Sequence, residues 1–248
     1  MDDVRYEAPE SPDEAVSLLA QAGSEGKVFA GGTDVMVQVH AELIEPGIIV
    51  DIKNIPGTIG VSESDGSYTF GAATPGMALI DDEGFASTWP GIIDGVALIG
   101  SIQVKGRASV GGNLCNASPA ADSVPCLLSL DANVELRSIN KKRIIPLSKF
   151  IKGSRKTNLK KNELLTSILI PREKEKGIST FLKIGARKYL IISITMAACR
   201  MEINQKIIKS ASISIGSCSE VAKRITSVEK LLIGKHIDKN DLEKIDFK

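Results

Sequence analysis

The sequence predicts an α+β protein whose N-terminal part alternates strands with helices and whose C-terminal part is an antiparallel sheet. Three observations support this prediction. Apolar runs and helix-capping signals alternate over the first fifty residues, three β-branched runs follow residue 180, and a polar stretch separates the two regions. The sequence contains neither an internal repeat nor a low-complexity segment.

The composition is that of a globular protein with a large core. Hydrophobic residues make up 43% of the 248 residues and charged residues 25%. The 31 Lys and Arg nearly balance the 30 Asp and Glu, so no overall field favours nucleic acid, a membrane surface or a highly charged substrate. The longest apolar stretch, residues 190–199, is about half as long as a membrane-spanning helix.

Several kinds of active site are disfavoured by what the sequence lacks. The four cysteines form neither a zinc pattern nor an iron–sulfur pattern, and the N-terminus does not resemble a signal peptide. We therefore expect a chain without a metal, located in the reducing cytoplasm. His40 and His236 each stand alone, which disfavours a His-based triad. Neither a P-loop nor a G-x-G-x-x-G motif is present.

The first fifty residues predict the order strand, helix, strand, helix, strand. A capping box at residues 11–14 begins a helix that Gly23 ends. Residues 27–30 form a short apolar strand, and apolar residues at helical spacing follow the glycine pair at 31 and 32. Residues 47–52 close this unit as a buried strand.

The middle of the chain predicts a hairpin and several helices before a strongly basic stretch. The elements are a hairpin over residues 58–72, helices over 76–81 and 90–99, a short strand that ends in residues 109–113, a helix capped by Ser118, and a strand over 133–137. Residues 137–161 contain ten Lys or Arg and no acid. We interpret this stretch as a solvated face of loops and a short helix; a docking patch is the alternative.

The end of the chain predicts a second domain. A polar, charged stretch over residues 171–177 indicates a boundary. Apolar runs near residues 180–184, 191–203 and 207–215 predict an antiparallel sheet, and a helix over residues 220–232 is expected to pack on it.

Two glycine pairs, Gly31-Gly32 and Gly111-Gly112, are the best candidates for a binding site. Glycine lets a ligand approach the backbone, free amides attract anionic oxygens, and a helix that starts nearby adds partial positive charge. Two such turns from opposite sides fit the diphosphate of a dinucleotide. The alternative is that each pair only makes a tight turn. Asp122 is placed either to bind a ribose hydroxyl or to stabilise a helix first turn.

Two segments resemble signatures of the FAD-binding subunit of molybdenum-containing hydroxylases. Residues 100–123 read GSIQVKGRASVGGNLCNASPAADS, and residues 30–34 read AGGTD. The family includes the medium subunit of carbon monoxide dehydrogenase and the flavin subunits of xanthine and nicotinate dehydrogenases. The resemblance covers essentially the whole chain, because residues 181–197 are similar to the start of the family's C-terminal domain.

The resemblance implies a p-cresol methylhydroxylase-like FAD-binding fold. Its FAD-binding domain would span residues 1–172, as two α/β subdomains of about 1–54 and 55–172. A C-terminal domain with a three-stranded antiparallel sheet and helices would span residues 177–248, where either the domain is shorter than in relatives or the sequence is truncated. The implied activity is that of an oxidoreductase subunit with non-covalent FAD. It would take electrons from [2Fe-2S] clusters on a small partner subunit, which drain a molybdopterin large subunit, and pass them to NAD or another acceptor.

The resemblance also implies a set of cofactor-binding residues, none of them catalytic. Residues 28–35 and 109–113 match the segments around the diphosphate, and Asp122 matches a flavin contact. Ile99 and Leu165 match apolar positions near the cofactor, and Lys183 matches a lysine near it. The set is Val28, Phe29, Ala30, Gly31, Gly32, Thr33, Asp34, Val35, Ile99, Ser109, Val110, Gly111, Gly112, Asn113, Asp122, Leu165 and Lys183.

The sequence departs from the family pattern in two places. Residues 103–106 read QVKG where many members read QIRN, and Thr180 and Phe181 occupy the place of a tyrosine near the flavin ring. Two other functions stay open: a flavin-free assembly scaffold of such a complex, and a stand-alone flavin reductase on the same fold. The substrate would bind the molybdenum subunit, so carbon monoxide, purines, nicotinate and aldehydes all remain open.

Overall fold

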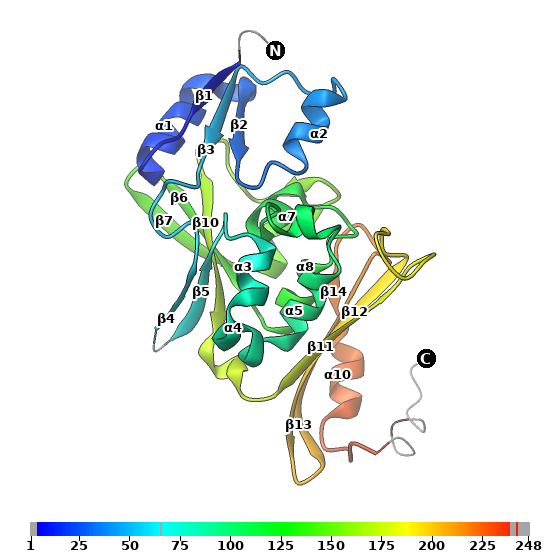
Figure 1. The fold of residues 1–248 in the computed structure, drawn as a ribbon. Helices are drawn as coiled ribbons and strands as arrows, with labels where there is room; N and C mark the ends of the chain where they lie inside the picture. Colours follow the sequence, from blue (N-terminus) through cyan, green and yellow to red (C-terminus); the bar gives the residue numbers. More distant parts are fainter. Residues whose placement is uncertain (1–3, 65, 239–241, 243–248) are drawn as a thin grey trace.

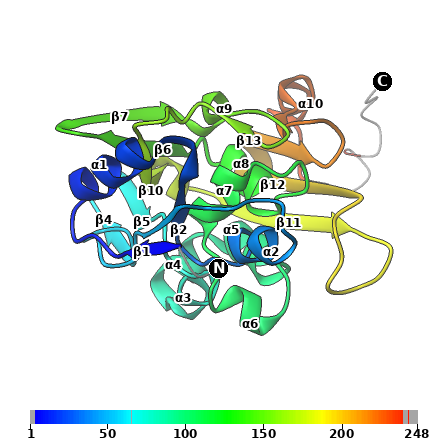
Figure 2. The same cartoon turned by 90° about the horizontal axis from the view of Figure 1, so that it is seen from above.

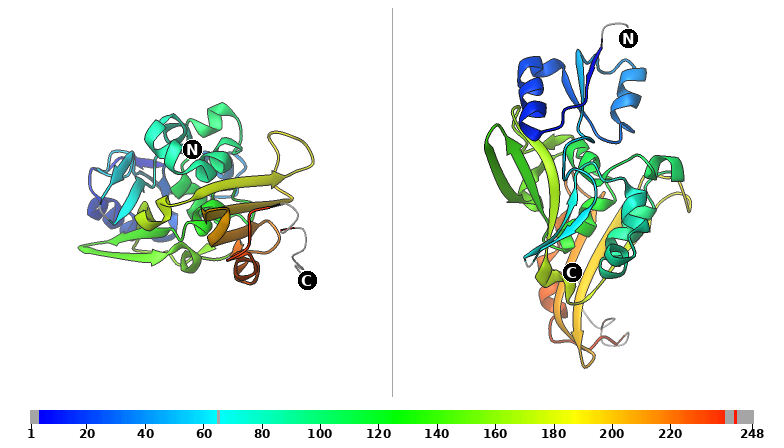
Figure 3. Two further views of the ribbon diagram at one scale, coloured as in Figure 1. Left: turned by 90° about the horizontal axis from the view of Figure 1, so that it is seen from below. Right: turned by 60° about the vertical axis from the view of Figure 1, so that its left-hand side comes forward.

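The computed structural model describes residues 4–64, 66–238 and 242, which form three parts along one axis (Figure 1). A three-stranded sheet lies at one end, a five-stranded sheet with most of the helices lies in the middle, and a four-stranded sheet lies at the other end. Figure 3 shows the first part as a separate lobe at one end of the chain, with α1 (Pro12–Ala22) packed on β6 (Asn133–Ser138) and β10 (Leu164–Pro171). This is the α+β architecture that the sequence predicts.

The N-terminal part is a small parallel sheet with a helix on each side (Figure 1). Its elements are β1 (Arg5–Glu7), α1 (Pro12–Ala22), the 3-10 turn η1 (Gly23–Glu25), β2 (Gly26–Phe29), α2 (Val35–His40) and β3 (Ile48–Asp51), with β3 between β1 and β2. Ser11 caps α1 as predicted, because its hydroxyl accepts a hydrogen bond from the amide of Glu14 at 3.2 Å. The Glu14 carboxylate completes the cap one residue earlier than expected, on the amide of Glu10 at 3.1 Å.

The middle part is an antiparallel sheet in the order β4-β5-β10-β6-β7. The central strand β10 is buried along most of its length. A two-stranded sheet, β8 with β9, lies beside it. The strands are β4 (Val61–Glu63), β5 (Ser67–Gly71), β6 (Asn133–Ser138), β7 (Lys141–Pro146), β8 (Ile151–Gly153), β9 (Lys156–Thr157) and β10 (Leu164–Pro171).

Seven short helices accompany this sheet, and all except α6 bury residues against it or against one another. They are α3 (Gly76–Asp81), α4 (Glu83–Thr88), α5 (Pro90–Ala97), α6 (Ile102–Lys105), α7 (Val110–Asn116), α8 (Ser123–Ser129) and α9 (Leu147–Phe150). Two edge-to-face ring pairs hold helices to the sheet: Tyr68 on Trp89 at 5.3 Å and Phe70 on Phe85 at 5.5 Å between ring centres. The same buried cluster continues into the C-terminal sheet through Phe181.

The C-terminal part is an antiparallel sheet in the order β11-β12-β13-β14. A 3-10 turn η2 (Arg172–Glu175) leads into β11 (Ile178–Ile184), β12 (Thr195–Asn204), β13 (Ile207–Gly216), the short β14 (Lys223–Arg224) and α10 (Thr226–Leu232). One face of the sheet packs on α5 and α8, and α10 packs on β13. The connection between β11 and β12 extends beyond the end of the sheet (Figure 2).

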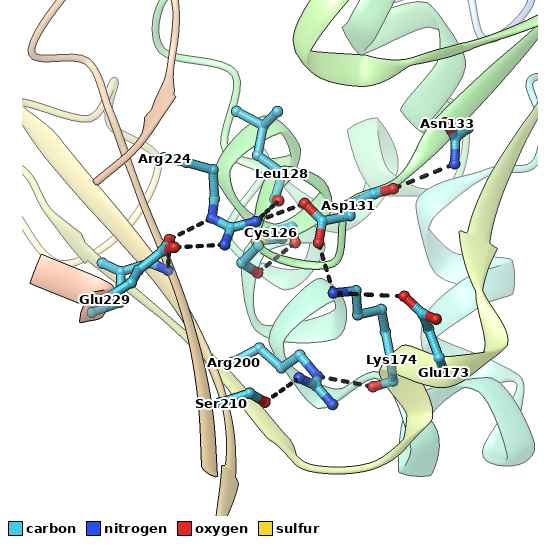
Figure 4. Close-up of polar contacts among 12 residues, drawn as sticks. Cys126, Leu128, Asp131, Asn133, Glu173, Lys174, Arg200, Ser210, Arg224 and Glu229 are labelled. Atoms are coloured by element: carbon cyan, nitrogen blue, oxygen red, sulfur yellow. Dashed lines mark hydrogen bonds and ion pairs between the residues drawn. The ribbon is translucent and has the colours of Figure 1, made fainter. Parts of the chain in front are cut away.

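A cluster of charged residues joins the C-terminal sheet to the middle part (Figure 4). The Asp131 carboxylate accepts from Arg224 and from Lys174, each at 2.7 Å. Arg224 also donates to both carboxylate oxygens of Glu229 in α10, at 2.5 and 2.7 Å. Arg200 of β12 donates to the Lys174 carbonyl at 3.0 Å. Ion pairs at Asp131 therefore join the C-terminal part to the middle part, in addition to the hydrophobic core that the two parts share.

Several predicted elements differ from the observed ones. The pair Gly111-Gly112 does not follow a strand; it lies in the first turn of α7, with Ser109 as its cap. Ser118 does not cap a helix, since α8 starts at Ser123. The last helix starts at Thr226, because residues before it form loop and β14. Residues 141–146, expected as loop, form β7.

No helix of the described ranges is long and apolar enough to cross a membrane. All four cysteines are free thiols. Within the same ranges, His, Cys, Asp and Glu form no group of three or more that could hold a metal ion.

Acids from outside the predicted basic stretch neutralise part of it. Arg143 on β7 donates to both carboxylate oxygens of the buried Glu163, each at 2.7 Å. The same carboxylate accepts from the Lys160 amide at 3.0 Å. Lys142 pairs with Glu135 on the neighbouring strand at 3.0 Å. Arg143 and Lys142 therefore stabilise the sheet and its neighbouring loop through ion pairs within the protein.

We predict that Glu163 makes stability depend on pH in the acid range. The Arg143 hydrogen bonds hold the pKa of Glu163 below its ordinary value of 4.5. The stabilisation is therefore present above that value and is lost as the pH falls through the lower pKa of the folded state. Glu163→Gln should cost about 2 kcal/mol at pH 7 and should reduce the loss of stability between pH 7 and about pH 3. Urea denaturation at both pH values tests this; an unchanged acid dependence would contradict it.

Candidate functional site

A cavity of about 480 Å³ lies between the N-terminal part and the middle part, and both glycine pairs line it. Most of the residues that the sequence assigns to a cofactor line this cavity. They are Val28, Ala30, Gly31, Gly32, Thr33, Asp34, Val35, Ile99, Ser109, Val110, Gly111, Gly112, Asn113 and Leu165. Phe29, Asp122 and Lys183 are not among the lining residues.

The first glycine pair forms a turn between β2 and α2. Gly32 has a φ of +71°, a conformation that favours glycine. Lys53 holds the start of the turn, since its Nζ donates to the Ala30 carbonyl at 3.2 Å and pairs with Asp51 at 2.5 Å. The amides of Gly31 to Asp34 make no hydrogen bond to another group of the described chain. They are therefore available to an anionic ligand.

The second glycine pair opens α7 on the opposite wall of the cavity. The Ser109 hydroxyl accepts from the Gly112 amide at 3.1 Å and so caps the helix. Asn113 is fixed one turn further on, where its Oδ1 accepts from the Ser123 hydroxyl at 2.7 Å. The two pairs face one cavity as the sequence predicts, although one belongs to a turn and the other to a helix.

The glycines are required by contacts inside the protein. A Cβ on Gly31 would overlap the carbonyl oxygen of Arg107, and a Cβ on Gly111 would overlap the carbonyl oxygen of Ala72. A Cβ on Gly32 would strike the ring of Phe29, which lies beneath the turn. Protein atoms therefore already fill the space into which a side chain at Gly32 or Gly111 would project.

Asp122 and Lys183 form a buried ion pair away from the lining of the cavity. The Lys183 Nζ lies 2.7 Å from the Asp122 carboxylate, and both side chains are at most one-tenth exposed. The Ser193 hydroxyl donates to the other Asp122 oxygen at 2.5 Å. This group joins α8 to β11 and to the segment that precedes β12. The predicted flavin contacts of Asp122 and Lys183 stay predictions.

Several cavity residues were not predicted from the sequence. They include Lys27, Gln38, Ile44, Lys105, Asn116, Leu159 and Leu164. Leu164 precedes the predicted Leu165 in the same apolar run, so this run could have indicated both residues as cavity wall. Gln38 and Asn116 are polar residues on short helices, and no local pattern distinguishes them from surface residues.

The chain has two parts built from strands and helices, a cavity between them that two glycine segments line, and a C-terminal antiparallel sheet. This arrangement is typical of a flavoprotein that binds a dinucleotide. The chain belongs to the family described as the FAD binding domain in molybdopterin dehydrogenase, which matches residues 2–173. Residues 180–245 match the CO dehydrogenase flavoprotein C-terminal domain. The chain is thus an FAD-binding flavoprotein subunit of the molybdenum hydroxylase class of oxidoreductases.

Individual relatives agree with this family. The carbon monoxide dehydrogenase medium chain of Hydrogenophaga pseudoflava is 31% identical over 166 residues, which are 67% of this chain and 58% of that relative. The nicotinate dehydrogenase FAD-subunit of Eubacterium barkeri is 25% identical over 98% of this chain and 84% of its own. The solved CO dehydrogenase of Oligotropha carboxidovorans superposes with a TM-score of 0.91 at 28% identity, covering 97% of this chain and 84% of that one. These likenesses confirm the predicted fold class.

The lining residues fit FAD. The partner-free amides at Gly31 to Asp34 lie on the same cavity as the start of α7, which suits the two charges of a diphosphate. Ile99 and Leu165 supply apolar wall for the flat ring systems.

We predict that Gly31→Ala destabilises the fold by about 1–3 kcal/mol, because the added carbon meets a backbone carbonyl that cannot rotate away. Gly66→Ala is the matched control, since nothing lies within 4 Å of its Cβ position. Thermal unfolding of the two variants compares them directly. Equal unfolding midpoints would contradict the close contact.

We predict that Asp122→Ala destabilises the cofactor-free chain by about 3–5 kcal/mol, because Lys183 would stay buried without a counter-ion. The double variant Asp122→Ala with Lys183→Met should recover part of this loss. Urea denaturation measures both. An unchanged stability together with weaker FAD binding would instead support a direct flavin contact.

Proposed function

We propose that this chain is the electron-transfer subunit of a molybdenum-containing hydroxylase or dehydrogenase. It receives electrons from [2Fe-2S] clusters of a small partner subunit and delivers them to NAD or another acceptor. Bound FAD supplies this redox chemistry, since it accepts and donates both single electrons and hydride. The chain itself binds and orients the cofactor and contributes no nucleophile or metal.

The observation that carries the proposal is the pair of glycine segments on opposite walls of one cavity. Residues 31–34 offer partner-free amides to the diphosphate, and residues 109–113 close the other side. Ile99 and Leu165, which line the cavity, would contact the ring systems. A stand-alone reductase would need an acid or base for its own substrate. The buried carboxylates of the described residues, Asp51, Asp122, Glu163 and Glu229, are all occupied by ion pairs.

The proposed domains are an FAD-binding domain over residues 1–172, with subdomains of about 1–54 and 55–172, and a C-terminal domain over residues 177–248. Separate sheets in the three parts support these limits, as do the family matches to residues 2–173 and 180–245. The cytoplasm is the proposed location, and the four free thiols accord with a reducing compartment.

We predict that the purified chain retains FAD after desalting and that it binds riboflavin at least about 100-fold more weakly. Riboflavin lacks the diphosphate, so two charge-assisted hydrogen bonds of about 1.5 kcal/mol each would be lost. Absorbance spectra and titration of flavin fluorescence measure both affinities. A colourless chain after incubation with FAD would support the scaffold function. Equal affinities for FAD and riboflavin would show that the diphosphate does not contribute to binding.

We predict that flavin, iron and molybdenum elute together when the chain is purified from its own cell. Metal analysis of the column fractions measures this, with the chain produced alone as the control. Flavin that elutes with this chain and without either metal would support the stand-alone reductase.

A further inference from the structure

Beyond the Lys53 contact at Ala30, the first glycine turn and α2 have one polar anchor to other segments of the described chain. Within the described residues, every hydrogen bond or ion pair that links residues 31–43 to another segment ends on Asp34. Helix α2 itself buries only Val39, and Val37 is 63% exposed. The position of the turn therefore depends on Lys53 at Ala30, on the backbone contact at Gly31 and on the Asp34 carboxylate.

Asp34 is held from two directions. The Asn116 amide, at the end of α7, donates to Asp34 Oδ1 at 3.1 Å. The Arg155 guanidinium, between β8 and β9, lies 3.5 Å from the same oxygen and also donates to the Asn116 side-chain carbonyl. The Gln38 amide donates to Asp34 Oδ2. Asn116 thus links the first glycine turn to the helix that begins with the second glycine pair.

Arg155 is itself fixed by backbone contacts. Its amide donates to the carbonyl of Ala117 at 2.9 Å, directly after α7. The pairing of β8 with β9 holds the turn that carries it. Its φ of +57° is a conformation that non-glycine residues adopt rarely, so this turn is defined by its contacts.

The charge of Asp34 would oppose an anionic ligand. Asp34 lines the cavity beside the partner-free amides, and an uncompensated carboxylate there would repel a diphosphate. Arg155 removes this repulsion because it pairs with the carboxylate. The side chains are 42% and 56% exposed, so the effect should weaken with salt.

We propose that Arg155 is a positioning residue of the cofactor site: it neutralises Asp34 and holds the first glycine turn to the end of α7. The inference rests on the proposed function, since FAD is the ligand whose diphosphate would occupy the cavity. Arg155 acts through Asp34 and Asn116, and the ligand contacts are made by the backbone amides that these residues position.

The test is FAD affinity and dissociation rate in the full chain, followed by flavin fluorescence. Arg155→Ala should weaken FAD binding about tenfold at low salt, mainly through faster dissociation, and the loss should shrink at high salt. Arg155→Lys keeps the charge and should stay within about threefold of the unmodified chain. In an Asp34→Asn background, Arg155→Ala should cost at most about twofold, since no carboxylate remains to be neutralised.

Lys152→Ala is the matched control, because Lys152 is an exposed cation in the same hairpin that forms no ion pair among the described residues. It should leave FAD binding unchanged. An equal Arg155→Ala penalty in both backgrounds would mean that Arg155 touches the cofactor directly, which overturns the inference; so would an Arg155→Ala variant that binds like the control. Failure of the unmodified chain to bind FAD would overturn the proposed function as well.

Discussion

The contact between Gly31 and the carbonyl of Arg107 fixes the distance between the two walls of the cavity. Only a residue without a side chain allows this approach. Arg107 lies two residues before Ser109, which caps α7, so the contact places the first glycine turn relative to that helix. Gly111 has the same role, because its lack of a side chain lets α7 pack against the backbone of Ala72, directly after β5. The cavity is therefore defined mainly by backbone approach and only secondarily by side chains.

Several charged groups of this chain hold its parts together. Glu163 and Asp131 link strands and sheets, and the pair of Asp122 and Lys183 joins α8 to the C-terminal sheet. The cavity presents mainly glycine amides, small polar side chains and apolar wall, although Lys27, Asp34 and Lys105 also line it. A site of this kind binds and orients a cofactor whose chemistry is its own. This division suits a subunit that relays electrons between partners.

Local signals in the sequence predicted most of the elements. The cap at Ser11 and the β-branched runs of β12 and β13 depend on neighbouring residues, so they could be located without a structure. Strand β10 could not be placed, because a continuous apolar run carries no period and its pairing with β5 and β6 is set by distant residues. The start of the last helix was misplaced for a related reason, since residues before it pair with β13.

The candidate site divides in the same way. The two glycine pairs were identified because glycine has a distinctive backbone, but the atoms that demand it at Gly31 and Gly111 come from segments far along the chain. The pairing of Asp122 with Lys183, 61 residues apart, has no sequence signal at all. Arg155 could not be distinguished in the sequence from the other cations of residues 137–161, some of which pair with acids near the sheet while others face solvent.

Hydrogen–deuterium exchange of the full chain, with and without FAD, tests the central claim most directly. We predict slower exchange on FAD addition in the peptides that contain residues 31–34 and 110–113, and unchanged exchange in β13. Protection confined to other segments, with both glycine segments exchanging as before, would contradict it.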